Sequence, residues 1–446
     1  MSSQTTTGRP AAPGRGRTPP GPRAQGRLKA QVPGLARLDS PLTTYYALLG
    51  ATLLLLVIGL VMVLSASSVT SYRQTGSSFT VFKSQLVFAV AGLVPMFVAS
   101  RTPIRFWQRF AWPAVLLAIV LQGMVFSPLG VSVYGNRNWI AFAGQRLQPS
   151  EVAKIALIVW GSTVLCRKRS SLDSWSHVMI PVVLPVGLIV VGLVLAGRDL
   201  GTGLVLLLVL AALLFAAGAP ARMFLAAAAG MALLAGVLAT TSANRMARID
   251  AWLKGTCSDQ LGTCFQSIHG RYALADGGWW GVGLGASREK WSWLPEAHND
   301  FIFAIIGEEL GLVGALVVLA LFGVLAWACY RLVVRSDDPF VRVATAGVMA
   351  WVVGQALINI GAVIGMLPVI GVPLPLVSSG GTALLTTMFA LGMLLSFARQ
   401  EPDCRAALAD RPSLLRRSLA VVPSLRRAPE PDPSGHEAAA GRGPAR

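Results

Sequence analysis

The sequence predicts an all-α polytopic membrane protein with about ten transmembrane helices, and three observations support this fold class. Of the 446 residues, 54% are hydrophobic and only 13% are charged. The apolar runs repeatedly approach the roughly 20 residues that a helix needs to cross a bilayer. Basic residues collect in both tails and in alternate short loops, which fits an even number of spans.

Each expected span is a long apolar run. The ten spans are expected at residues 44–66, 81–100, 107–126, 150–166, 177–197, 201–218, 222–242, 300–330, 341–365 and 374–398. Together they form one domain, residues 44–398. Its longest connection, residues 243–299, lies between the seventh and eighth spans, and a loop this long in a compact bundle is usually functional or disordered.

The net charge of +18 could indicate nucleic-acid binding, but its distribution indicates topology instead. Arg101, Arg105, Arg109 and the run RKR at 167–169 lie in loops on the same side as the tails. By the positive-inside rule, this side and both tails are cytoplasmic, and the loop at 243–299 is extracellular. We therefore expect no nucleic-acid partner.

Both tails are expected to lack a fold of their own. Residues 1–43 form a basic cytoplasmic tail that is rich in Pro, Gly and Arg and too poor in apolar residues to build a core. Residues 399–446 form the second cytoplasmic tail. The tail arginines are expected to act as a topology signal with a weak attraction to anionic membrane lipids.

The extracellular loop has a composition that argues against disorder. It holds five of the twelve tryptophans: Trp252, Trp279, Trp280, Trp291 and Trp293. Tryptophan favours the membrane interface, so the loop is expected to lie along the membrane surface, with residues 244–255 as a short interfacial helix. The glycines between 277 and 285 permit tight turns. They do not form a nucleotide site, because no strand precedes them and no Lys-Ser/Thr pair follows.

The eighth expected span begins with a carboxylate, Asp300, and carries two more, Glu308 and Glu309. An ionised side chain costs roughly 2.5–3.5 kcal/mol in a bilayer core on insertion scales, so such residues usually face a bundle interior or a polar cavity. If the helix starts near Asn299, Asp300 lies in its first turn, where it either caps the helix or does chemistry.

On a regular helix, Asp300 shares a face with small residues. These are Ala304, Gly307, Gly311 and Gly314. The GxxxG spacing lets another membrane helix approach closely, so this face is expected to point into the bundle. Glu308 and Glu309 point elsewhere, and basic residues from other helices are their expected partners.

Two more polar stretches interrupt apolar spans. In QPSEVAK at 148–154, Glu151 and Lys154 share a helix face, which fits a local ion pair or an intramembrane cation with an anionic partner. The run SSGG at 378–381 follows three prolines. It is typical of a broken helix end whose freed backbone donors line a cavity, or of a helix-packing turn.

Four motifs, in this order along the chain, resemble the SEDS family (shape, elongation, division and sporulation). They are NWIAFAGQRLQPSEVAK at 138–154, RDLGTG at 198–203, GGWWGVGLGASREKWSWLPEAHNDFIFAIIGEELG at 277–311 and NIGAVIGMLPVIGVPLPLVSSGG at 359–381. The resemblance covers nearly everything between the tails and is closest to the division branch. The chain departs from the family pattern at Asn138, Arg198 and Ser379, where the family often has Arg, Pro and Tyr.

The resemblance implies a peptidoglycan glycosyltransferase that polymerises lipid II on the outer face of the bacterial plasma membrane, at the division septum. Asp300 matches the family's catalytic aspartate, which as a general base would take the proton of the acceptor sugar 4-hydroxyl. The departing undecaprenyl pyrophosphate needs positive charge or N–H donors. The resemblance implies no definite cofactor and leaves a divalent cation open.

The candidate substrate-binding residues lie within or beside these motifs. They are Arg137, Trp139, Gln148, Ser150, Glu151, Lys154, Lys290, His298, Ser378 and Gly380. Lys290 is either a phosphate ligand or a solvated side chain. No protein-bound metal is expected.

The resemblance also implies partners, namely a class B penicillin-binding protein and other divisome proteins. Two alternative functions remain. One is a lipid II flippase or another transporter, since ten spans with internal charges also fit a translocation path. The other is a scaffold at the division site.

The cysteines fall on two sides of the membrane. Cys166, Cys329 and Cys404 are expected on the cytoplasmic side, and Cys257 and Cys264 in the extracellular loop. The outer spacing is also compatible with zinc, but no neighbouring Cys/His pair would complete four ligands. We predict a disulfide between the outer pair, because disulfides persist in the oxidising exterior. A membrane-impermeant thiol reagent should label neither outer cysteine of intact cells before reduction; labelling of both would show free thiols.

Overall fold

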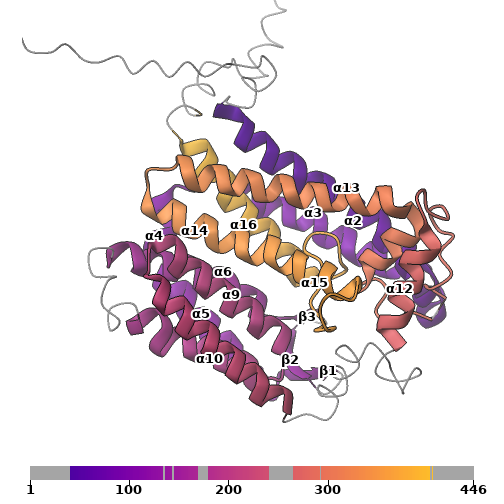
Figure 1. Ribbon diagram of the computed structural model, residues 1–446, viewed down its shortest axis with the longest axis horizontal. Coiled ribbons are helices and arrows are strands. Elements are labelled where there is room, and N and C mark those ends of the chain that lie inside the picture. The colour runs from indigo at the N-terminus through magenta and orange to yellow at the C-terminus, as the bar shows by residue number, and fades with distance from the viewer. Residues whose placement is uncertain are drawn as a thin grey trace, which may run out of the picture. The chain divides into compact units, whose positions relative to one another are not determined.

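The computed structural model describes residues 41–133, 136–142, 145–168, 179–240, 265–291, 293–401 and 404 (Figure 1). Residues 1–40 and 405–446 lie outside the described residues, and so do residues 244–255 and the cysteines Cys257 and Cys264. The expectations for these parts of the chain stay predictions.

The described chain is mostly helical, which confirms the predicted class. Its helices are α2 (Pro41–Thr75), α3 (Thr80–Arg101), α4 (Ile104–Arg109), α5 (Ala111–Met124), α6 (Pro149–Arg167), η3 (Met179–Gly187), α8 (Leu188–Ala196), α9 (Leu200–Ala217), α10 (Ala221–Thr240), α12 (Phe265–Gly277), α13 (Ile302–Arg335), α14 (Pro339–Met349), η4 (Ala350–Gly354), α15 (Gln355–Val363) and α16 (Gly381–Gln400).

Among the described residues, seven helices are long and apolar enough to cross a membrane. They are α2, α3, α6, α9, α13, the continuous helix Pro339–Val363 and α16. Two shorter apolar helices, Ala111–Met124 and Val182–Ala196, lie at two other expected spans, and α10 lies at the remaining one. The protein is therefore a polytopic membrane protein, while the count of ten stays a prediction.

Two span boundaries differ from the expected ones by seven residues or more. The first helix, α2, continues to Thr75 instead of ending near residue 66. The last helix, α16, begins at Gly381 instead of residue 374, because Leu376 has a φ of 66° and Gly380 has a φ of 171° and a ψ of 100°, which are not helical. Residues 364–380, here called the proline segment, are consequently non-helical and connect α15 to α16.

A three-stranded antiparallel sheet follows α5, which the all-α expectation missed. Its strands are β1 (Gly130–Val133), β2 (Asn136–Phe142) and β3 (Gln145–Leu147), in the order β1-β2-β3. Strands this short give almost no periodic signal between two apolar spans. The backbone N–H of Arg137 donates to the Gly197 carbonyl oxygen at 3.0 Å, which ties β2 to the helical bundle.

The centre of the bundle is α6. Of its most apolar stretch, 89% is buried, the highest fraction among the seven long helices. It packs against α5, α9 and α14, while α3 packs on α16 and α2 packs on α13. In Figure 1, α12 and the sheet lie toward the same end of these helices. By the predicted topology, this is the extracellular end.

The long helix α13 is interrupted at Gly311, whose φ of 69° and ψ of −169° are not helical. Gly307 and Gly311 permit a close approach, as the GxxxG pattern predicts, but their neighbours are Leu274 on α12 and the backbone at Trp279 and Gly281 instead of a membrane helix. A Cβ atom on Gly311 would lie 2.5 Å from the Trp279 carbonyl oxygen. The predicted face through Gly314 is wrong, because the helix is not regular across Gly311.

Buried Glu309 joins three parts of the chain. Its carboxylate accepts hydrogen bonds from Ser65 Oγ on α2 at 2.6 and 2.7 Å, and from Lys290 Nζ at 3.0 Å. Lys290 is itself only 4% exposed, and it also donates to the Gly285 carbonyl oxygen at 2.6 Å. The expectation of a solvated Lys290 is therefore wrong. The basic partner of Glu309 belongs to the connection that precedes α13, and not to another membrane helix as expected.

The neighbouring carboxylate of Glu308 holds the same segment through neutral donors. It accepts from Ser287 Oγ and from the backbone N–H of Arg288, both at 2.6 Å. Two adjacent carboxylates of α13 thus anchor residues 285–290. The expected partner for Glu308, a basic side chain from another helix, is replaced by backbone and hydroxyl groups of this segment.

We predict that Gly311→Leu destabilises the protein far more than Leu312→Ala. The backbone of Gly311 lies in a region that is essentially restricted to glycine and costs other residues about 1–3 kcal/mol, and a side chain would also collide with the backbone at Trp279. Leu312 is 42% exposed. Thermal unfolding of the purified variants measures the difference, and equal midpoints would contradict the close packing at Gly311.

We also predict that Glu309→Gln destabilises the protein by about 3–5 kcal/mol, because it leaves the buried Lys290 ammonium without its carboxylate. The double variant Glu309→Gln, Lys290→Met should regain much of this loss. Chemical unfolding in one detergent compares the three proteins. A double variant no more stable than the single one would mean that the ion pair does not determine the loss.

Candidate active site

Asp300 lies in a turn before α13, not in the first helical turn as expected. The helix begins at Ile302, and its N-cap residue is Phe301, so Asp300 also lies outside the capping position. The turn is closed by the backbone N–H groups of Asn299 and Phe301, which both donate to the Glu296 carbonyl oxygen, at 2.9 and 3.3 Å. The half-buried Asp300 carboxylate therefore lies on a structured turn just before the N-terminus of α13.

A small pocket adjoins Asp300. It is lined by Asp300, Phe301, Ile358, Asn359, Ala362, Val363, Val369, Ile370, Gly371 and Val372. Eight of these ten lining residues are apolar or glycine, so Asp300 and Asn359 supply its polar side chains. Gly371 has a φ of 77°, and a Cβ atom there would lie 3.5 Å from Asp300 Oδ2. The carboxylate thus packs close to the backbone of the proline segment.

Asn359 connects Asp300 to the proline segment. Its Nδ2 atom donates to the backbone carbonyl oxygens of Asp300 and Val372, each at 2.7 Å. Asn359 is 3% exposed and lies on α15. Three elements therefore meet at one amide group: the Asp300 turn, α15 and the proline segment.

The end of the proline segment lies against the residues just before Asp300. Ser378 Oγ donates to the Asn299 carbonyl oxygen at 2.7 Å, and the Ser379 N–H donates to the His298 carbonyl oxygen at 2.9 Å. The Gly380 N–H donates to Gln85 Oε1 on α3 at 3.1 Å. Two backbone donors of the SSGG run are thus used inside the protein, which favours the packing-turn alternative.

His298 contributes a half-buried imidazole beside this contact. Burial lowers the pKa of His298, and the nearby Glu296 carboxylate opposes the shift only in part. The imidazole is therefore neutral at neutral pH. A neutral ring can accept or donate one hydrogen bond but supplies no positive charge for a phosphate.

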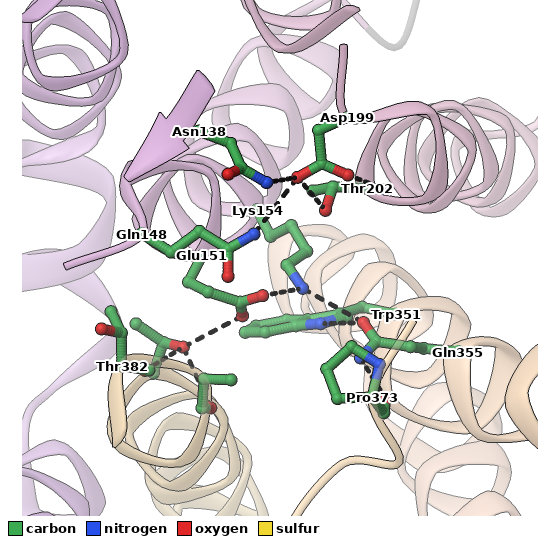
Figure 2. A network of polar contacts seen from close by, with 12 residues as sticks. Asn138, Gln148, Glu151, Lys154, Asp199, Thr202, Trp351, Gln355, Pro373 and Thr382 are labelled. Carbon is green, nitrogen blue, oxygen red and sulfur yellow. Dashed lines mark hydrogen bonds and ion pairs between the residues drawn. The ribbon is translucent and has the colours of Figure 1, made fainter. Parts of the chain in front are cut away.

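Glu151 and Lys154 form a buried ion pair on α6, as their spacing predicts (Figure 2). Lys154 Nζ lies 2.8 Å from Glu151 Oε1 and 3.1 Å from Gln355 Oε1, and 4.8 Å from the centre of the Trp351 ring. Lys154 is 1% exposed. The Lys154 ammonium thus has only protein partners among the described residues. Of the two alternatives predicted for it, the local ion pair matches these contacts.

A second polar cluster, around Asp199, lies beside this pair in Figure 2. Asp199 caps α9 by accepting from the Thr202 N–H at 3.0 Å, and it also accepts from Asn138 Nδ2 at 3.0 Å and Gln148 Nε2 at 3.2 Å. It therefore ties the sheet and the start of α6 to α9. This role was not predicted from the sequence, although an Asp just before an apolar run, as in RDLGTG, is a capping signal.

Helix α15 links the ion pair to Asp300. Gln355, which accepts from Lys154, donates through Nε2 to the Pro373 carbonyl oxygen at 2.8 Å. Asn359, one helical turn further along, holds Asp300 and Val372. Both amides were missed by the sequence analysis. The sequence did contain a signal for them: Gln355 and Asn359 are two amides four residues apart in an apolar run, so they share one helix face inside the bundle.

Other predicted site residues lie elsewhere or have other contacts. Lys290 belongs to the Glu309 cluster. Arg137 is exposed on β2 and donates to the Ser127 carbonyl oxygen at 2.9 Å, and Trp139 is half-buried on the same strand. Ser150 is buried. Within the described ranges, no three His, Cys, Asp or Glu residues cluster closely enough to hold a metal ion.

Comparison with known proteins identifies the family. A sequence model of the cell cycle protein family, named for FtsW, RodA and SpoVE, matches residues 46–402. The chain is 40% identical over 403 residues to a probable peptidoglycan glycosyltransferase FtsW of Mycobacterium tuberculosis, covering 88% of this chain and 76% of that protein. It is 35% identical over 353 residues to stage V sporulation protein E of Bacillus subtilis, covering 78% of this chain and 95% of that protein.

Solved structures share the fold. One similar chain comes from a structure of a peptidoglycan synthase complex, described as showing the structural coordination of polymerization and crosslinking. Its TM-score is 0.66 and its identity 26%, over 80% of this chain and 98% of that chain. The rod shape determining protein RodA of Thermus thermophilus has a TM-score of 0.59 and 22% identity, over 80% and 97%. The resemblance inferred from the four motifs is thus confirmed, and the chain belongs to the FtsW, RodA and SpoVE family of cell cycle proteins, the SEDS family.

Proposed function

We propose that this protein is a peptidoglycan glycosyltransferase that polymerises lipid II, with Asp300 as its general base. One observation carries the proposal: a carboxylate on a structured turn lines a largely apolar pocket at the predicted extracellular end of the bundle. The relatives named as probable peptidoglycan glycosyltransferases support the reaction class.

In the proposed reaction, Asp300 takes the proton of the acceptor sugar 4-hydroxyl. The hydroxyl oxygen then forms a bond to the anomeric carbon of the donor, and the bond from that carbon to the pyrophosphate oxygen breaks. Undecaprenyl pyrophosphate leaves with the electron pair. A positioned carboxylate is suited to this proton transfer, which typically contributes about 10²–10⁴-fold to a rate.

The leaving pyrophosphate needs positive charge, and the predicted cations differ in access. Lys154 is buried and paired with Glu151, so direct contact with a phosphate would require that pair to separate. Lys290 is likewise paired with Glu309. Arg137 is exposed on β2, and we propose it as the more accessible phosphate ligand. A divalent cation carried by the substrate is a second source of charge.

The remaining candidates are assigned by their contacts. We propose that three of them, Gln148, Glu151 and Lys154, do not contact substrate. They would support its binding site by fixing the start of α6 against α9 and α15. Ser378 and Gly380 would hold the end of the proline segment against the Asp300 turn, and His298 would contribute its ring from that turn. Trp139 would offer an apolar ring beside Arg137, and Ser150 a hydroxyl at the start of α6.

We further propose a complex with a class B penicillin-binding protein and other divisome proteins at the division septum, with both termini in the cytoplasm. The structural relative taken from a synthase complex for polymerization and crosslinking supports a crosslinking partner. The charge distribution of the tails and short loops supports the orientation.

A transporter of lipid II is the second candidate function. The buried Glu151–Lys154 pair inside the most enclosed span favours it, because intramembrane charges also mark translocation paths. The two functions differ in what they require of Asp300. A base is essential for glycosyl transfer, whereas movement of the intact precursor breaks no bond.

We predict that Asp300→Asn lowers polymerisation by about 10²–10⁴-fold, because asparagine keeps the size of the side chain but cannot accept the proton. The assay supplies lipid II in detergent to the purified protein with its penicillin-binding partner and resolves glycan polymer on a gel. Asp276→Asn is the matched control, since it removes an exposed carboxylate at the end of α12 that does not line the pocket.

Equal polymer from the wild type and a stably folded Asp300→Asn variant would refute the role of Asp300. If the wild type makes no polymer under conditions that activate a known relative, the glycosyltransferase proposal fails. Transport of labelled lipid II across vesicles by the same protein would then support the transporter.

A further inference from the structure

Asn359 holds two backbone groups that belong to different parts of the pocket. Its Nδ2 atom donates at 2.7 Å to the carbonyl oxygen of Asp300 itself and at 2.7 Å to that of Val372. Val372 follows Gly371, the residue that packs against the Asp300 carboxylate. One amide group thus fixes both the chain that carries the carboxylate and the wall that faces it.

The orientation of this amide follows from its partners. A backbone carbonyl oxygen can only accept a hydrogen bond, so the atom that faces both carbonyls must be the nitrogen, which carries two donors. The amide oxygen, Oδ1, is buried and accepts no hydrogen bond from the described residues. Buried polar atoms without a partner are uncommon in folded proteins. The side chain therefore satisfies its two donors at the expense of its acceptor.

Neutral amides recur along the same face of α15. Gln355, four residues earlier, donates to the Pro373 carbonyl oxygen, which is the next carbonyl of the proline segment after that of Val372. Gln355 contacts the proline segment but not the Asp300 turn, whereas Asn359 contacts both. This difference separates a residue that folds the segment from one that places the carboxylate.

We propose that Asn359 is a positioning residue for Asp300: its amide sets the distance between the carboxylate and the opposite pocket wall, and thereby the alignment of the base with the acceptor hydroxyl. The inference rests on the proposed function of Asp300 as a base. Asn359 contacts the backbone of Asp300 and takes no proton. Its removal should reduce the rate of the chemical step while substrate binding is largely retained, because both donors of Asn359 are used by backbone carbonyl oxygens and not by substrate.

The test replaces Asn359 by leucine, which has the same number and branching of non-hydrogen side-chain atoms and no donors. We expect the kcat of polymerisation to fall by about 10–100-fold, because a displacement near 1 Å can cost that much, and the KM for lipid II to change by less than about twofold. Asn359→Ser retains one donor and should give a smaller fall in kcat, again with little change in KM. It also serves if the leucine variant does not fold.

Gln85→Leu is the matched control. Gln85 is also 3% exposed, and its amide also holds two backbone groups of the proline segment, the Ser378 carbonyl oxygen at 3.2 Å and the Gly380 N–H at 3.1 Å, without contact to Asp300. We expect it to lower the thermal midpoint about as much as Asn359→Leu and to keep kcat within about twofold. Equal kcat losses in the two variants would overturn the proposal.

Hydrogen exchange gives a readout that does not depend on activity. In Asn359→Leu or Asn359→Ser, amide exchange within residues 293–304 should rise at least about tenfold, because the turn has lost its anchor to α15. In Gln85→Leu, the rise should be confined to residues near 376–384. Unchanged exchange around Asp300 in the Asn359 variants would overturn the proposal, even where wild-type polymerisation has itself failed.

Discussion

The structure depends on one constraint, that polar groups inside an apolar bundle must find partners within the protein. Transfer of an ion into such an interior carries a penalty of several kcal/mol even after relaxation. Lys154 meets this requirement through Glu151, Gln355 and the face of Trp351. Because these partners belong to α6 and to the η4 and α15 parts of the continuous helix Pro339–Val363, the ion pair fixes how these two helices approach one another. The same requirement at Glu309 fixes Lys290, in the connection before α13, to α2 and α13.

The two clusters divide the tasks of the candidate site. The Glu308 and Glu309 carboxylates hold residues 285–290, and this segment precedes the Asp300 turn. The amides of α15 hold the turn itself and the proline segment opposite it. Asp300 is thus placed by contacts on both sides, although it lies outside any helix. A loop can carry a reactive group accurately when rigid elements on both sides define its backbone.

How much the sequence could predict depended on the separation of the interacting residues. The pair of Glu151 and Lys154 follows from a three-residue spacing on a helix. The bond from Lys154 to Gln355 joins residues 201 apart, and that from Asn359 to Asp300 joins residues 59 apart. No local pattern encodes such contacts. The apolar periodicity likewise located the helices but not their breaks, because the non-helical backbone of Gly311 depends on the neighbouring backbone at Trp279.

The chemistry proposed for Asp300 also explains why its anchors are neutral. A lysine or arginine in place of Asn359 could donate to the same carbonyl oxygens, but its charge would lie close to the carboxylate. A nearby positive charge stabilises the ionised carboxylate and lowers its affinity for a proton. A general base works best when its pKa lies nearer the operating pH, so such a charge would weaken it. An amide supplies the two donors without charge, and therefore fixes the geometry of the base without placing a positive charge beside it.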